Sequence, residues 1–131
     1  PDYLEAINRL IAQLSTSSHT FTEAELNSLI ASPQNHLYAL EYDEKIIGMV
    51  TLCIYQCPTG RKAWIEDVVV DQNHRGKGYG KLMLRKAMEE CQNRGNVTLM
   101  LTSRPSRIVA NQLYQSLGFE KRETNVYKMK F

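Results

Sequence analysis

The sequence is poor in cysteine, with three residues in 131, and their spacing forms no metal or redox motif. Cys53, Cys57 and Cys91 make an odd number, and none belongs to a CxxC pair or lies near a histidine-rich stretch. The pattern argues against a disulfide-stapled secreted domain and against a zinc site. We therefore expect reduced thiols in a cytoplasmic protein that binds no metal.

Long hydrophobic runs are also missing. No apolar run approaches the roughly 18 residues that a membrane span needs, and the first residues show no signal-peptide pattern. There is no internal repeat, low-complexity tract or interdomain linker. With 43% hydrophobic and 23% charged residues, the chain is expected to form one domain, residues 1–131, that buries its own core and has no membrane partner.

The charge is small overall but unevenly distributed. The net charge is +2, yet residues 1–70 hold 4 Lys or Arg against 9 Asp or Glu, and residues 71–131 hold 12 against 5. A basic second half fits a polyanionic ligand, and an acidic first half could attract a cationic one. An uneven solvated surface would give the same counts.

Hydrophobic periodicity and turn residues predict four helices and six strands. A capping-box pattern, Thr22-x-x-Glu25, opens the second helix, and Ser15–Ser18 breaks the first. The resulting order, ααβββαβαββ, describes an α/β (α+β) fold with a mixed central sheet flanked by helices and a parallel βαβ unit. The predicted helices are 3–14, 22–31, 81–94 and 105–117, and the predicted strands are 36–42, 46–56, 62–70, 97–102, 119–123 and 126–131.

A glycine-rich stretch, Asp71–Lys81, joins a strand to a helix. Gly76, Gly78 and Gly80 leave backbone N–H groups unshielded where that helix starts. The first amides of a helix lack internal partners and carry the positive end of its dipole, which suits an anion. Three basic residues add charge at the same spot: Arg75, Lys77 and Lys81. The stretch therefore predicts a phosphate-binding cradle, although glycines also serve as plain turns.

Two known glycine-rich devices do not match this stretch. A Walker-type loop needs Ser or Thr after Gly-Lys, and Gly80-Lys81 is followed by Leu82. A dinucleotide fingerprint needs GxGxxG and an acidic residue ending the next strand. Here the glycines run GxGxG, and the next strand ends in Leu101-Thr102-Ser103. Neither a nucleoside triphosphate nor a dinucleotide is the expected ligand.

A third device does match. Arg75–Gly80 fits the pattern Arg/Gln-x-x-Gly-x-Gly/Ala, the strand Ile65–Asp71 precedes it, and Asn111-Gln-Leu-Tyr114 with Leu117-Gly118-Phe119 follows. With these three segments the chain resembles the GNAT superfamily of acetyl-CoA-dependent N-acetyltransferases, well over residues 36–131 and loosely over the two early helices. The family usually has another strand before the first helix. This sequence starts too late to include that strand, so we expect the strand either to have been trimmed from this chain or to be absent from the protein.

The resemblance implies a coenzyme A site. Amides of residues 76–81 would hold the pyrophosphate, and exposed backbone of the preceding strand would pair with pantetheine where that strand and the next splay apart. An amide of the same strand would polarise the thioester carbonyl. The implied acetyl-CoA contacts are Val68, Val69, Val70, Arg75, Gly76, Lys77, Gly78, Tyr79, Gly80, Lys81, Asn111 and Tyr114.

The resemblance also implies roles in catalysis. An alkylamine has a pKa of about 10.4 and must lose its proton before it attacks, so a carboxylate is a natural base. Glu66 is expected as base or water-orienting group, with Asp67 and Glu66 contacting the substrate. The other reading of both carboxylates is a local ion pair. Tyr114 would protonate the departing thiolate, and its alternative role is that of a core tyrosine.

The sequence therefore predicts an N-acetyltransferase that moves an acetyl group from acetyl-CoA to a primary amine of a small molecule or peptide. The alternative is a non-catalytic acyl-CoA-binding regulatory module. Nucleic acid is not an expected partner, because the basic half lacks a recognition helix or an aromatic platform. The terminal segment, Phe119–Phe131, offers an edge through which a homodimer could form.

Overall fold

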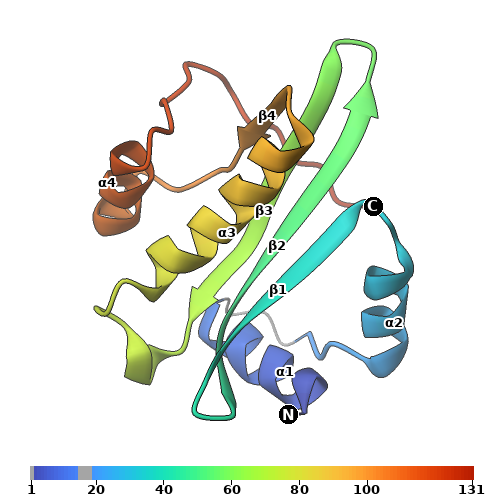
Figure 1. The fold of residues 1–131 in the computed structure, drawn as a ribbon, viewed down its shortest axis with the longest axis vertical. Coiled ribbons are helices and arrows are strands. Elements are labelled where there is room, and N and C mark those ends of the chain that lie inside the picture. The colour runs from blue at the N-terminus through green and yellow to red at the C-terminus, as the bar shows by residue number, and fades with distance from the viewer. Residues whose placement is uncertain (1, 15–18) are drawn as a thin grey trace. The chain divides into compact units, whose positions relative to one another are not determined.

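The computed structural model describes residues 2–14 and 19–131. The chain divides into two compact units, residues 1–101 and 102–131, and each is described by itself (Figure 1). The break predicted over Ser15–Ser18 lies outside the described residues. The elements of the first unit are α1 (Tyr3–Leu14), α2 (Glu23–Ala31), β1 (Asn35–Tyr42), β2 (Lys45–Cys57), β3 (Gly60–Val70), η1 (Gln72–His74), α3 (Tyr79–Arg94) and β4 (Val97–Met100).

The four strands form one mixed sheet in the order β1-β2-β3-β4. β1 and β2 form an antiparallel hairpin, β2 and β3 form a second one, and β3 pairs with β4 in parallel. The parallel pair requires a crossover, which α3 supplies. The mixed sheet flanked by helices confirms the fold class expected from the sequence.

Helices α1 and α3 pack on opposite faces of the sheet. The apolar side of α1, with Ala6, Ile7 and Leu10, joins Met49 of β2 and Val69 of β3 in one buried cluster. On the other face, a Cβ placed on Gly48 would lie 2.9 Å from the Met83 sulfur of α3. Since neighbouring strand residues point to opposite faces, Gly48 and Met49 mark the two sides of the core.

Local signals explain where the helices begin and end. The capping box of α2 forms as predicted: the Glu25 amide donates to Thr22 Oγ1 at 3.2 Å, and the Thr22 amide donates to Glu25 Oε1 at 3.1 Å. Helix α3 begins after Gly78 and ends at Gly95, whose positive φ of 71° reverses the chain direction. The sequence placed both ends of α3 within two residues.

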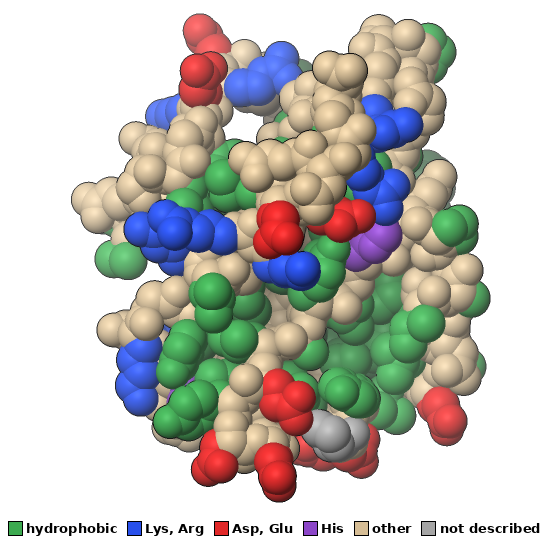
Figure 2. Space-filling view, viewed as in Figure 1, with side chains coloured by type: hydrophobic (Ala, Val, Ile, Leu, Met, Phe, Trp, Pro, Cys, Tyr) green, Lys and Arg blue, Asp and Glu red, His purple; other side chains and the backbone are tan. Residues whose placement is uncertain are grey.

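Several acidic side chains gather at one end of the sheet. Figure 2 shows them at the lower end of the view, where α1 and the β1–β2 turn lie in Figure 1. The turn contributes three of them, Glu41, Asp43 and Glu44, and all are exposed. The same end of the sheet carries the last residues of β3, because Gly48 near the start of β2 pairs with Val70.

The second unit holds one helix, α4 (Ile108–Ser116). The sequence predicted its start at residue 105 or 106. It begins later because the Asn111 side chain donates to the carbonyls of Arg104 at 2.9 Å and Arg107 at 2.8 Å, which holds the preceding residues in a turn.

The predicted terminal hairpin, Phe119–Glu123 with Val126–Phe131, is wrong: no strand forms after α4. The linking pair Thr124-Asn125 lacks the glycine that two-residue hairpin turns favour. Residues 120–131 are all exposed, so no buried apolar face stabilises the pairing. A two-stranded hairpin without such a face is marginally stable in water.

None of the described helices is long and apolar enough to cross a membrane.

Candidate active site

The end of strand β3 is bulged. Met49 pairs with Val69 and Thr51 pairs with Glu66, so Val50 alone faces two residues of β3, Asp67 and Val68. Asp67 has a positive φ of 52°, which is strained for a residue with a side chain. The bulge breaks the usual alternation, and Glu66 and Asp67 are both exposed. Periodicity could not foresee this, because a bulge of this kind leaves no sequence signal without glycine.

The bulged end of β3 also has an open edge. Only Arg61–Trp64 pairs with β4, so β4 leaves Ile65–Val70 unpaired on that side. The Asp71 amide donates to Ile47 of β2 at 2.7 Å. Amide direction alternates along an antiparallel strand, so the N–H and C=O of Val70 point away from β2, toward the open edge. The Val70 carbonyl accepts a hydrogen bond from Arg75 Nε at 3.1 Å.

The glycine stretch leads from this edge into α3. Gly76 and Gly78 have φ of 77° and 81°, and a Cβ at either position would meet nothing within 4 Å. Glycine is therefore required by the backbone, and the space beside it is free. Gly78 is the N-cap of α3 and no side chain caps the helix, so the first amides of α3 stay available.

Charge at the cradle favours an anion. Arg75, Lys77 and Lys81 are exposed there, and residues 72–81 contain no carboxylate. The Tyr79 ring lies 6.5 Å from the ring of Tyr42 at the end of β1. Its side chain therefore packs toward β1, while its backbone amide is the first of α3. Open amides, glycine spacing and basic side chains fit the pyrophosphate of coenzyme A.

Helix α1 fixes the start of the cradle, a relationship that the sequence did not suggest. Arg9 Nη1 lies 2.5 Å from Asp71 Oδ2, and Asp71 is buried with 2% exposure. Asp71 Oδ1 accepts the Asn73 amide at 3.0 Å, which caps η1. One turn along α1, Gln13 Oε1 accepts the Gln72 amide at 2.8 Å. The sequence signal that could have indicated the capping role of Asp71 is the pattern Asp-x-Asn directly after a strand.

Its surroundings change the electrostatics of Glu66. Desolvation raises the pKa of Glu66, and the neighbouring charge of Asp67 adds to that rise. A carboxylate with a raised pKa is a better proton acceptor than an ordinary one. No ion pair joins Glu66 or Asp67 to a basic side chain in residues 2–14 and 19–131, so the local ion pair considered from the sequence does not form.

The second unit carries the remaining predicted residues. Tyr114 is buried at 9% exposure, and its ring meets Phe119 edge-on at 6.2 Å. The Phe119 amide donates to the Tyr114 carbonyl at 3.1 Å. Asn111 uses its side-chain NH₂ group on the backbone of its own turn, which leaves Oδ1 as its free polar atom. The motif Asn-x-x-Tyr…Leu-Gly-Phe therefore forms a compact helix end.

Among the described residues, no group of three His, Cys, Asp or Glu side chains is placed to hold a metal ion.

Comparison with known proteins places this geometry in a family. The sequence profile described as Acetyltransferase (GNAT) family matches residues 4–119. N-acetyltransferase 8B of Homo sapiens is 31% identical over 86 residues, which are 64% of this chain and 38% of that protein. The ribosomal protein bS18-alanine N-acetyltransferase of Salmonella typhimurium is 37% identical over 60 residues, 46% of this chain and 40% of that enzyme. The matched stretches thus span less than half the length of these curated relatives.

A solved structure supports the same assignment. A protein described as an acetyltransferase from Agrobacterium tumefaciens superposes with a TM-score of 0.88 at 25% identity, and the match covers 97% of this chain and 93% of that one. The resemblance expected from three short segments is therefore confirmed over the length of the fold. The chain belongs to the GNAT acetyltransferase family.

Proposed function

We propose that this chain transfers an acetyl group from acetyl-CoA to a primary amine of a small molecule or a protein. The observation that carries the proposal is the open edge of β3, Ile65–Val70, which leads directly into the glycine cradle before α3. An extended thioester arm can pair with such an edge while its pyrophosphate meets the helix amides.

Donor binding in this proposal uses main-chain groups of the first unit. The amides of Gly76 to Lys81 bind the pyrophosphate, and Arg75, which is anchored to the Val70 carbonyl at 3.1 Å, adds a fixed positive charge. The backbone of Val68, Val69 and Val70 borders the pantetheine arm. In the second unit, Asn111 has Oδ1 free to accept a hydrogen bond from the arm.

Acetyl transfer then needs one proton acceptor and one proton donor. The protonated amine first gives one proton to Glu66, directly or through one water. The neutral nitrogen then attacks the thioester carbonyl carbon and releases its second proton to solvent. An amide at the bulge of β3 stabilises the developing oxyanion. The C–S bond breaks, Tyr114 gives its phenolic proton to the departing thiolate, and the products are the N-acetyl amine and free coenzyme A.

The acceptor is proposed to be a cationic amine. Asp67 is exposed beside Glu66, and the acidic turn between β1 and β2 lies at the same end of the sheet (Figure 2). An amine that arrives protonated is attracted by such a surface. One relative is named for the alanine of a ribosomal protein, and this name supports the proposal of an amine acceptor. We place the protein in the cytoplasm and propose that it works as a homodimer.

The test is turnover with a panel of amines. Polyamines, aminoglycosides, lysine peptides and peptides with free N-termini are each incubated with acetyl-CoA, and the released thiol is measured. We expect thiol release with at least one amine and an acetyl-CoA-dependent rise in melting temperature. A rise in melting temperature without turnover, together with equal behaviour of Tyr114→Phe, would indicate a binding module instead. The absence of both thiol release and a rise in melting temperature would refute the coenzyme A site itself.

A further inference from the structure

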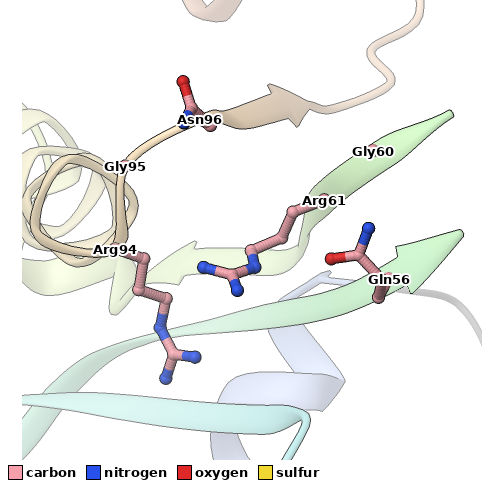
Figure 3. Close-up of a pocket in the computed structure, with 6 residues that line it drawn as sticks. All are labelled: Gln56, Gly60, Arg61, Arg94, Gly95 and Asn96. Carbon is pink, nitrogen blue, oxygen red and sulfur yellow. The ribbon is translucent and has the colours of Figure 1, made fainter.

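A polar hollow lies at the end of the first unit opposite the cradle. It has a volume of about 390 Å³ and is lined by residues of the β2–β3 turn region and of the α3–β4 junction. In Figure 3 the side chains of Arg61 and Gln56 reach into it from the two strands, and Arg94 borders it from the end of α3. The six lining residues are Gln56, Gly60, Arg61, Arg94, Gly95 and Asn96.

The two arginines of the hollow are in different states. Arg94 is held in place, because its Nε lies 2.9 Å from Glu90 Oε1 and its Nη2 lies 3.2 Å from His36 Nε2. Arg61, in contrast, makes no side-chain hydrogen bond or ion pair with any described residue. The lining contains no carboxylate, so a second positive charge is left without a counterion there.

We propose that this hollow binds a small anion that carries carboxylate or phosphate groups. A guanidinium offers a planar fork of donors that matches both groups in a bidentate manner. The restrained Arg94 presents its remaining N–H donors at low entropic cost, and Arg61 swings to close on the anion. The Gln56 amide can accept or donate beside them. The negative end of the α3 dipole opposes an anion, but Arg94 sits on that end and offsets it.

The hollow is separate from the candidate coenzyme A site. Helix α3 has 16 residues, and at about 1.5 Å per residue its two ends lie roughly 24 Å apart. An anion in the hollow and a pyrophosphate at the cradle can therefore be bound together. The inference does not depend on the proposed acetyl transfer, since it rests on Arg61, Arg94 and Gln56 alone.

Calorimetric titration tests the proposal. Citrate and inorganic phosphate are titrated separately into the full chain at constant ionic strength set with sodium chloride. We expect one of them to bind with a Kd below about 1 mM, and Arg61→Gln to weaken it at least tenfold, as loss of one charge-assisted fork implies. Tight citrate binding would assign a polycarboxylate ligand, and tighter phosphate binding would assign a phosphorylated one.

Matched variants locate the binding. Lys62→Gln removes the same charge one residue away, on the opposite face of β3, and should change the Kd less than threefold. Arg75→Gln tests the cradle and should also leave the Kd of the hollow's ligand unchanged. The proposal is overturned if Arg61→Gln binds both anions as the wild type does, or if neither anion binds the wild type below 10 mM. Because Arg61 is exposed, its replacement leaves the fold intact, which circular dichroism verifies.

Discussion

Arg9 of α1 and Asp71 after β3 form an ion pair with 2.5 Å between Nη1 and Oδ2, across 62 positions of the chain. Arg9 Nη2 also donates to the Ile46 carbonyl at 2.7 Å, so one guanidinium ties the helix to two strands. The carboxylate is buried and the guanidinium is three-quarters covered. This contact fixes the point at which β3 leaves the sheet and the glycine cradle begins.

Removing the guanidinium should destabilise the fold and loosen the cradle. Arg9→Ala leaves a buried carboxylate without its cation, and we expect the free energy of unfolding to fall by roughly 2–4 kcal/mol. The Michaelis constant for acetyl-CoA should rise more than kcat falls, because in the proposed mechanism the cradle binds acetyl-CoA and takes no part in the chemical step. Urea unfolding and steady-state kinetics measure the two effects. Glu5→Gln removes the exposed partner of Arg9, which lies 3.5 Å away, and should cost less than about 0.5 kcal/mol; equal losses from both variants would contradict the account.

Acid should weaken the same contact. The Asn73 amide lowers the pKa of Asp71, burial opposes this, and Arg9, Lys45 and His74 lower the pKa further. A carboxyl with a lowered folded pKa stabilises the fold fully above its unfolded pKa of about 3.9, and the contribution is lost as the pH falls toward the folded value. The free energy of unfolding, measured from pH 6 to pH 3, should therefore fall more steeply with pH below about pH 4 in the wild type. The same fall should be shallower in Asp71→Asn. Identical acid limbs would show that Asp71 does not titrate with folding.

Substitution of Gly78, compared with that of Gly95, should distinguish the effect of backbone strain from the effect on ligand binding. An alanine at φ 81° costs about 1–2 kcal/mol in the left-handed region, and in Gly78→Ala its methyl group would also occupy the open side of the cradle. We expect a lower melting temperature and at least a tenfold higher Michaelis constant for acetyl-CoA. Gly95→Ala, at φ 71° beyond the other end of α3, should lower the melting temperature alone. If both variants kept the wild-type Michaelis constant, the cradle would not be the pyrophosphate site.

Close packing against Met83 and Val69 should require glycine at position 48. A methyl group there would lie 2.9 Å from the Met83 sulfur and 3.2 Å from the Val69 carbonyl oxygen. We expect Gly48→Ala to lower the free energy of unfolding by about 1–3 kcal/mol, as overpacking does. The double variant Gly48→Ala with Met83→Ala should lose less than the sum of the two single variants, because the side chain in conflict is gone. Strict additivity would show that the Val69 backbone, and not Met83, sets the limit.

Much of this fold was predictable because its signals are local. The capping box at Thr22, the glycines at the ends of α3 and the residue patterns that predict strands β2 and β3 each act within a few residues, and these elements were confirmed. The bulge at Asp67 and the Arg9–Asp71 pair were not predictable, because they depend on partners that meet only when the sheet and α1 assemble. The terminal hairpin was predicted from its residue pattern and the turn pair Thr124-Asn125, and such local signals cannot supply the second surface that a strand pair needs.

For the site residues too, features encoded locally could be predicted and features that depend on distant partners could not. The glycine cradle could be located because positive φ and helix amides are encoded within a few positions, Gly76 to Lys81. Whether Glu66 and Asp67 face the same side could not be settled from the sequence, since alternation and a bulge give opposite answers. The bulge exposes both carboxylates.

The pH dependence of turnover should report Glu66. Desolvation and the Asp67 charge raise the pKa of Glu66. In the proposed mechanism Glu66 therefore accepts a proton above that pKa and loses this role as the pH falls through it. We expect kcat/KM for the amine to decline on the acid side with an apparent pKa above 4.5, the ordinary value, beyond the decline due to amine protonation. Glu66→Gln should lower kcat by about 10²-fold or more and remove that limb. Asp67→Asn should mainly raise the Michaelis constant of the amine. If Glu66→Gln kept the pH dependence of kcat/KM seen in the wild type, another group would be the base.

Product analysis tests direct acetyl transfer to an amine most directly. Acetyl-CoA and the best amine of the panel are varied together, and mass spectrometry quantifies acetylated amine and coenzyme A in the same samples. Direct attack of the amine on the bound thioester, without a covalent acetyl-enzyme, predicts equal amounts of both products and intersecting initial-velocity lines. Coenzyme A release without acetylated amine, or parallel lines with an acetylated protein, would contradict it.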